Sequence, residues 1–392
     1  RASTGYYDTV NQSAIGNNSI AIGTESRALS AGSMAFGAGS IANATGAITI
    51  GVNSTASGAN SSAFGTEAIA SAEDAMAFGF KAIANNLNAL ALGAEAKATG
   101  TNSIAIGDEA KASNGMTTAV GRQAQATGFD GTALGSVSKA MGFRATAIGT
   151  LSRASARNST AIGAKSSALG NYSGAFGTEA NASGLASMAF GAGSIANNTG
   201  AITLGVNSTA SGANASTFGT EAQATAEDAI AFGYSAAASG IDSIAIGKSA
   251  VASKSNSTAI GTDANATALN SSAFGDAAEA SGNQATAFGA GSAATKENAT
   301  AIGEKANASG TQSTAVGRQS LASKHDATAL GTASKATGER ASAIGVLAKA
   351  SGKCSTAVGA LAVANGTLSQ SFGANATASA TNSTAIGSYS KS

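Results

Sequence analysis

A glycine recurs at every fourteenth residue from Gly23 to Gly387, and no other feature constrains the fold of this chain as strongly. The lattice holds 27 glycines, and the residue before each one is Ile, Phe, Leu or Val. The fifth residue after each of the first 26 is alanine. Self-similarity at a fixed period predicts a solenoid, in which each coil is stable only when it stacks on its neighbours. Positions are numbered below from the lattice glycine, so that Ile22 is at −1 and Ala28 at +5.

Each period of 14 residues contains two short alternating segments. Positions −3 to −1, as in Ile20-Ala21-Ile22, alternate large, small and large, which is typical of a β-strand. Positions +3 and +5 are always Ala or Ser around a variable +4, which predicts a second strand with one small face and one face in water. Glycine at +7 and Asn or Asp at +9 predict turns with positive φ. The sequence therefore predicts an all-β solenoid rather than a helical fold.

The large residues at −1 predict that the chain assembles into an oligomer. An interior lined by Ala, Ser and Gly is too narrow for them, so alternation turns them to the outside of the first strand. Stacked coils would align them at roughly 4.8 Å intervals in a continuous apolar stripe. Such a stripe has to be buried, and a closed cyclic assembly of identical chains would bury it, at about 1.5–3 kcal/mol per side chain. The alternative is a single-chain solenoid whose coils enclose these residues. The oligomer core is predicted to contain Ile22, Phe36, Phe64, Phe78, Ile106, Ile148, Ile162, Phe176, Phe218, Phe274, Phe288 and Ile386.

The run Asn18-Ser-Ile-Ala-Ile-Gly-Thr-Glu-Ser26 resembles the NSVAIGxxS signature of the heads of trimeric autotransporter adhesins, the YadA-like family. Close variants begin at Asn102, Asn158 and Asn382, and the resemblance covers residues 19–392. It implies a left-handed parallel β-roll assembled as a homotrimer on the outer membrane of a Gram-negative bacterium. It also implies binding to collagen, fibronectin, laminin or other surfaces. We expect an N-terminal cap over 1–18, a head of about 27 repeats over 19–392, and a stalk and membrane anchor outside this sequence.

The resemblance also implies ligand contacts at the polar residues of the signature. The predicted ligand-binding residues are Asn18, Ser19, Ser26, Asn102, Ser103, Asn158, Ser159, Ser166, Asn382 and Ser383.

Composition narrows the function. Only 11% of the residues are charged and the net charge is +1, which offers no electrostatic footprint for nucleic acid. His325 is the only histidine, so we predict no catalytic set, no metal site, no cofactor and no enzyme activity. Cys354 is the only cysteine, which leaves a free thiol or an intermolecular disulfide. The acidic pairs Glu73-Asp74 and Glu227-Asp228 are interpreted as solvated rims, with a weak cation site as the alternative.

An internal duplication supports an adhesive function. Residues 32–79 match residues 186–233 at 40 of 48 positions, so the head was lengthened by whole coils, which favours reach and multivalency. Two other functions stay open. Threonine occupies 11 of the 27 positions at −3, as at Thr118 and Thr132, and a flat threonine ladder would suit an ice or crystal surface. Alternatively, the roll is a spacer that presents the tip formed by residues 1–18.

Overall fold

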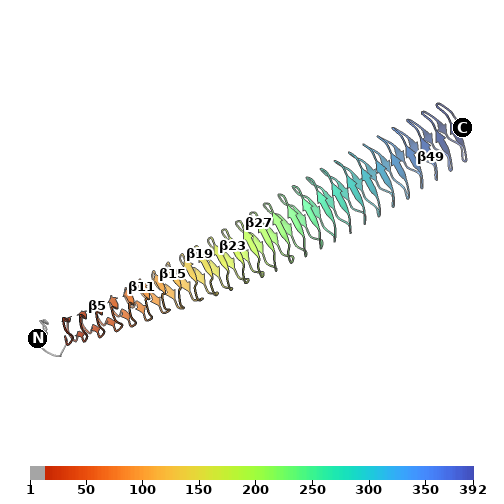
Figure 1. Cartoon of the computed structure of the whole chain (residues 1–392). Helices are drawn as coiled ribbons and strands as arrows, with labels where there is room; N and C mark the ends of the chain where they lie inside the picture. Colours follow the sequence, from red (N-terminus) through yellow and green to blue (C-terminus); the bar gives the residue numbers. More distant parts are fainter. Residues whose placement is uncertain (1–13) are drawn as a thin grey trace. The chain divides into compact units, whose positions relative to one another are not determined.

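The computed structural model describes residues 14–392 and divides the chain into two units, residues 1–197 and 198–392. Each unit is built from strands and turns alone, and residues 14–392 form no helix. Figure 1 shows the strands of each unit stacked side by side in chain order. The predicted all-β parallel solenoid of 14-residue coils is confirmed.

Every coil contributes one strand to each of two parallel sheets. Each odd-numbered strand covers the three residues before a lattice glycine, and each even-numbered strand covers the fourth and fifth residues after it. The first unit begins with β1 (Ile20–Ile22) and β2 (Arg27–Ala28) and ends with β26 (Ile195–Ala196). The second unit begins with β27 (Ile202–Leu204) and ends with β53 (Thr384–Ile386). Both strands of the coil lie where the alternation predicts them.

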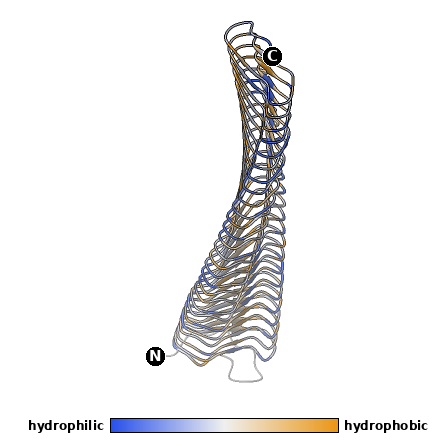
Figure 2. Cartoon of the chain, turned by 90° about the vertical axis from the view of Figure 1, so that its right-hand side faces the viewer, coloured by the Kyte–Doolittle hydropathy of each residue, from blue (hydrophilic) through white to orange (hydrophobic). Residues whose placement is uncertain are grey.

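The register between neighbouring coils follows the 14-residue period. Strand β13 (Ile104–Ile106) pairs in parallel with β15 (Thr118–Val120), so that Ala105 lies beside Ala119 and Ile106 beside Val120. Each position therefore stacks on the same position of the next coil. Figure 2 shows the coils of each unit stacked one on the next, with hydrophilic and hydrophobic stretches within the coils. A residue type repeated at one position becomes a ladder on the surface or in the interior.

The interior of each coil holds only small side chains. The alanines at −2 and +5 are almost entirely inaccessible, and the largest fully buried side chains are threonines, among them Thr49 and Thr203. The large residues at −1 lie outside, since Ile22 is 51% exposed and Phe218 is 48% exposed. The alternative in which a single chain encloses its large residues is therefore wrong, and the narrow interior is confirmed.

The lattice glycine is needed for two reasons. Gly65 has φ +137°, which side-chain-bearing residues rarely adopt. A Cβ at this residue would also lie 2.4 Å from the carbonyl oxygen of Gly79, the lattice glycine of the next coil. Any side chain here would push the coils apart, which explains why the lattice is unbroken.

The turn residues confirm one expectation and correct another. The residue at +9 has positive φ in every coil, as at Asn60 with φ 56°, and a second position, +2, shares this conformation, as at Glu67 with φ 58°. The glycines at +7 do not have positive φ, so that part of the prediction is wrong. At Gly58 the reason is instead a close approach, because a Cβ would lie 1.9 Å from the carbonyl oxygen of Ala72.

The predicted N-terminal cap over 1–18 lies largely outside the described residues. Of its described part, Ala14 forms a parallel bridge with Ala28, and Ile15 N donates to the Ala28 carbonyl oxygen at 2.9 Å. These residues continue the backbone pairing of the coils. The cap stays a prediction.

Candidate binding surfaces

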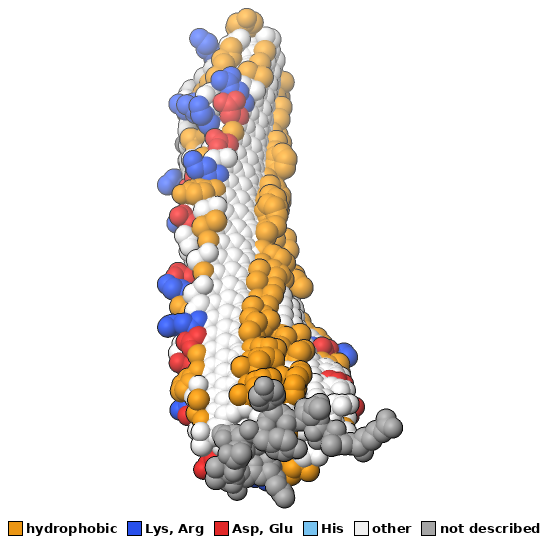
Figure 3. All heavy atoms as spheres, turned by 90° about the vertical axis from the view of Figure 1, so that its left-hand side faces the viewer, with side chains coloured by type: hydrophobic (Ala, Val, Ile, Leu, Met, Phe, Trp, Pro, Cys, Tyr) orange, Lys and Arg blue, Asp and Glu red, His pale blue; other side chains and the backbone are white. Residues whose placement is uncertain are grey.

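The apolar stripe is the first candidate surface. All 12 residues predicted for the oligomer core lie on the outer face of the first sheet, and none of them is buried within the single chain. Their exposure reaches 56% at Phe288 and 73% at Ile386. Figure 3 shows a band of hydrophobic side chains beside a strip of backbone and uncharged polar side chains, with many charged side chains along a separate edge. A row of large apolar side chains in solvent marks a contact surface.

The phenylalanines of the stripe stack on one another from coil to coil. The rings of Phe64 and Phe78 lie 4.8 Å apart at 4°, and those of Phe176 and Phe190 lie 4.6 Å apart at 6°. Stacking covers one face of each ring and leaves the edge toward solvent. The coil spacing thus aligns these rings in the stripe, although Phe274 and Phe288 are tilted by 40° at 5.9 Å.

The threonine ladder at −3 shares this face. Thr118, Thr132 and Thr146 are aligned in register on consecutive strands, and each is half-buried. Each threonine lies two residues from a stripe residue and points to the same side of the sheet. A partner chain that covers the stripe would cover these threonines, so the geometry does not favour an ice or crystal surface here.

The structure places the predicted serines in the interior. Ser19, Ser26, Ser103, Ser159 and Ser166 are at most 2% exposed. Three of these hydroxyls donate to carbonyls three residues earlier in the chain, the Ser19 hydroxyl to Gly16 O at 2.7 Å for example. The hydroxyl oxygen of Ser383 is buried as well. These serines fill the narrow interior of the coil, and their buried hydroxyls offer no surface to a ligand.

The asparagines of the signature lie in the turn at +9, where Asn102 and Asn382 are exposed and Asn158 is partly exposed; Asn18 is exposed too. All four have positive φ. Between coils these side chains form ladders, in which Asn88 Nδ2 donates to Asn102 Oδ1 at 2.9 Å. The positive φ of this turn explains why asparagine occurs here. Because the side-chain amides are exposed, contact with a ligand stays a prediction.

Ion pairs between neighbouring coils were missed from the sequence. Six pairs join residues 14 positions apart, such as Glu67 with Lys81 at 3.7 Å and Lys165 with Glu179 at 2.9 Å. The hydrogen bond and charge of Glu179 raise the pKa of Lys165, and Lys165 in turn lowers the pKa of Glu179. Opposite charges spaced by one period were the available signal. Each of these exposed ion pairs contributes little to the stability of the fold.

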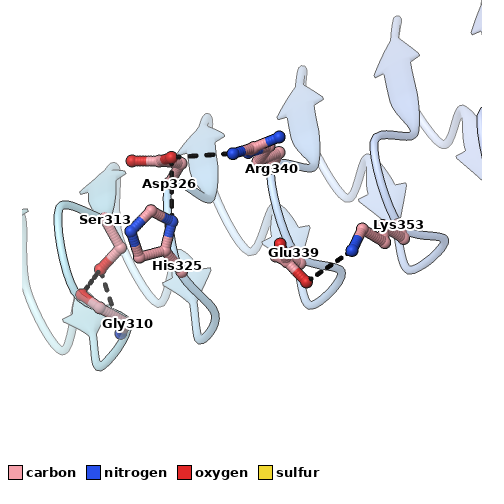
Figure 4. A network of polar contacts seen from close by, with 7 residues as sticks. All are labelled: Gly310, Ser313, His325, Asp326, Glu339, Arg340 and Lys353. Carbon is pink, nitrogen blue, oxygen red and sulfur yellow. Dashed lines mark hydrogen bonds and ion pairs between the residues drawn. The ribbon is translucent and has the colours of Figure 1, made fainter.

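The region around His325 is drawn in Figure 4. His325 Nδ1 lies 2.9 Å from Asp326 Oδ2, and Arg340 Nε lies 3.8 Å from the same oxygen. One coil on, Lys353 Nζ lies 3.1 Å from Glu339 Oε2, and this contact lowers the pKa of Glu339. All these side chains are substantially exposed, so the group is an open surface network rather than an enclosed pocket.

The remaining sequence candidates also lie in turns. Cys354 is partly exposed at +9. Asp74 accepts a hydrogen bond from Asn60, and Asp228 accepts one from Asn214, so both acidic pairs belong to the turn ladders. Within residues 14–392, no cluster of three or more His, Cys, Asp or Glu side chains has an arrangement that could hold a metal ion.

The stacked 14-residue coils, the invariant close glycines and the outward apolar stripe define a class, the repetitive β-solenoid head that offers long faces instead of a pocket. The family model of the YadA head domain repeat (2 copies) matches this chain 15 times. The matches run from residues 14–40 to 364–390 and cover most of the chain. The chain belongs to the YadA head repeat family, and it is an adhesin-like head of the trimeric autotransporter kind.

No curated protein sequence matches the chain. The described part of the chain, 14–392, contains no helix with the length and apolar character needed to cross a bilayer.

Proposed function

We propose that this chain is the head of a homotrimeric bacterial surface adhesin that attaches the cell to extracellular matrix proteins or to abiotic surfaces. The outward apolar stripe carries the proposal. It runs through the coils of each unit, and burying it between three chains would leave the turns and the outer face of the second sheet exposed to solvent. Membership of the YadA head family supports the same assembly.

Adhesion would come from many weak contacts. Each coil presents the same turn and outer-strand positions, so three chains display dozens of equivalent contact points. Linking many weak contacts raises overall avidity without any single strong site. We assign the chain no catalysis and place it outside the cell, at the outer membrane of a Gram-negative bacterium.

Plate binding tests the proposal. The purified chain is applied to immobilised collagen, fibronectin and laminin, with bare polystyrene and glass in the same plate. Saturable binding to a matrix protein supports a host-directed adhesin, and binding to the bare surfaces alone supports a general attachment head. Binding to none of the five surfaces would overturn the proposal.

Deletion of coils distinguishes multivalent adhesion from a single site. Removing residues 32–73, three whole periods, keeps the register and should weaken binding only in part. If one point substitution in an exposed turn, such as Asn102→Ala, abolished binding altogether, the multivalent account would be wrong.

A further inference from the structure

Two groups of basic residues recur at the same positions in the two units. The first basic patch lies on the first unit and the second basic patch on the second, and corresponding residues are 196 positions, or 14 coils, apart. The corresponding residues are Arg122 and Arg318, Lys139 and Lys335, Arg144 and Arg340, Arg153 and Lys349, and Arg157 and Lys353. Between the patches, residues 166–247 contain no Lys or Arg at all. The net charge of +1 conceals this segregation.

At the centre of each basic patch, two cations stack directly on one another. Lys139 and Arg153 are register partners in the second sheet, on β18 (Lys139–Ala140) and β20 (Arg153–Ala154). Lys335 and Lys349 are register partners on β46 (Lys335–Ala336) and β48 (Lys349–Ala350). Like charges placed side by side in a sheet are destabilising. The repeated arrangement has a cost to the fold.

No carboxylate of the described residues lies within ion-pair distance of these four cations. Arg153 Nε donates to the Ser155 hydroxyl at 2.8 Å, which orients the guanidinium without neutralising it. The +2 neighbours of the first pair are Val137 and Leu151, and those of the second pair are apolar too. Lys97 and Lys111 are register partners as well, and they too have no carboxylate within ion-pair distance among the described residues. They differ from the four patch cations in having a glutamate at +2 of the same coil, Glu95 and Glu109, which lowers the local net charge.

The patches stay accessible if the stripe is buried. The +4 side chains project from the outer face of the second sheet, whereas the stripe projects from the outer face of the first, across the coil. Arg153, Lys335 and Lys349 are exposed and Lys139 is half-buried. A homotrimer assembled through the stripe would present three copies of each patch on its outside.

We infer that the two basic patches bind a linear, densely sulfated polysaccharide. In each patch, two cations at the same position of adjacent coils lie roughly 4.8 Å apart, which suits a polymer that carries closely spaced anions along one line. Arginine and lysine pair with sulfate-like oxyanions by charge-assisted hydrogen bonds. The inference rests on the proposed function in one respect, since a surface-exposed head is what brings these patches to such a polymer.

A nucleic acid fits the patches less well. Single strands are held by aromatic side chains that stack on bases. The first patch has Phe129 and Phe143 stacked 5.8 Å apart, but the corresponding residues of the second patch are His325 and Glu339. Duplex reading needs a helix or ribbon that enters a groove, and the flat outer sheet offers neither. The shared feature of the two patches is charge alone.

The chain supplies its own neutral replacements for a test. Eleven coils beyond Lys139 and Arg153, the same positions hold Ala293 and Asn307, in strands that pair normally. The test variant carries Lys139→Ala, Arg153→Asn, Lys335→Ala and Lys349→Asn. The control variant removes four positive charges elsewhere, with Lys97→Val, Lys111→Asn, Lys248→Ala and Lys254→Ala.

Binding of the full chain to immobilised heparin is measured across a salt series, with duplex DNA and desulfated heparin as competitors. We expect the wild type and the control variant to bind heparin, and the test variant to bind at least tenfold more weakly and with a shallower salt dependence. Desulfated heparin should compete poorly. Absence of heparin binding at physiological salt, or equal losses in both variants, would overturn the inference. Equal competition by duplex DNA would overturn the assignment to a sulfated polysaccharide.

The same plates carry the matrix proteins and bare polystyrene, which separates the two proposals. Heparin binding without attachment to the other surfaces would contradict the adhesive function proposed above and still support the assignment of the two basic patches. Attachment to the other surfaces by both variants, with no heparin binding by the wild type, would do the reverse.

Discussion

The outer faces of the two sheets are both open to solvent in the single chain, yet their sequences differ in kind. On the first sheet, −1 is a large apolar residue in all 27 coils. On the second sheet, +4 ranges from Lys97 through Gln125 and Val251 to Glu279. Folding of the coil needs neither choice, because both faces point away from the interior. The constant apolar residues on the first sheet therefore indicate a contact with another molecule, whereas the residues on the outer face of the second sheet can vary from coil to coil.

A negative charge introduced on each outer face should give the largest difference between the two sheets. Ile162→Glu on β21 (Thr160–Ile162) removes about 1.5–3 kcal/mol of burial per chain and puts an unpaired charge into the oligomer core. We expect the proposed trimer to dissociate or the melting temperature to fall steeply. Ser167→Glu on β22 (Ser167–Ala168) should change stability by less than about 0.5 kcal/mol. Sedimentation velocity and circular dichroism measure both, and equal effects would mean that the stripe is not buried.

A change inside the coil should affect the two faces alike. Gly65→Ala imposes a side chain on a φ of +137° and places its Cβ against the next coil's backbone. The backbone strain alone costs about 1–3 kcal/mol. Thermal unfolding compares it with Thr66→Ala, an exposed neighbour in the same turn. A melting temperature equal to that of the Thr66 variant would show that the close packing at the lattice is not required.

The turn ion pairs should give the smallest effect. Contact with Lys353 lowers the pKa of Glu339 below its ordinary 4.5, so its stabilising contribution is present at neutral pH. That contribution should disappear as the pH falls below about 4.5 and through the folded-state value. We expect a small loss of stability in Glu339→Gln at pH 7 that shrinks as the pH falls from 4.5 through the lowered pKa of Glu339, and that shrinks in high salt as well. A difference between Glu339→Gln and wild type that stayed constant across this range would rule out the ion pair as its source.

Much of the fold could be predicted because the period fixes which residues stack. The alternation in Ile20-Ala21-Ile22 places two strands and sends the −1 residues outward. The positive φ at +2 could not be predicted from residue type, since Glu67 and Leu151 share it. Stacking hydrogen bonds, such as Glu67 N to Val52 O at 2.9 Å, hold that turn instead.

The binding surface was less predictable. The serines of the repeated signature suggest a ligand motif, yet Ser103 and Ser166 recur because only a small residue fits the interior. The basic patches were hidden by the near-zero net charge, and only the coil register brings Lys139 beside Arg153. In a solenoid, residues that share one repeat position on successive coils form a row on the surface. Its surface chemistry therefore becomes visible only when the sequence is aligned coil by coil.

Sedimentation equilibrium of the purified chain tests the central claim most directly, that the apolar stripe is buried between three chains. The chain has a mass of 37.1 kDa, so the account predicts three times that value, about 111 kDa, at all concentrations that can be measured. A folded species of 37.1 kDa, with the circular dichroism of a β-solenoid and the stripe left in water, would contradict it.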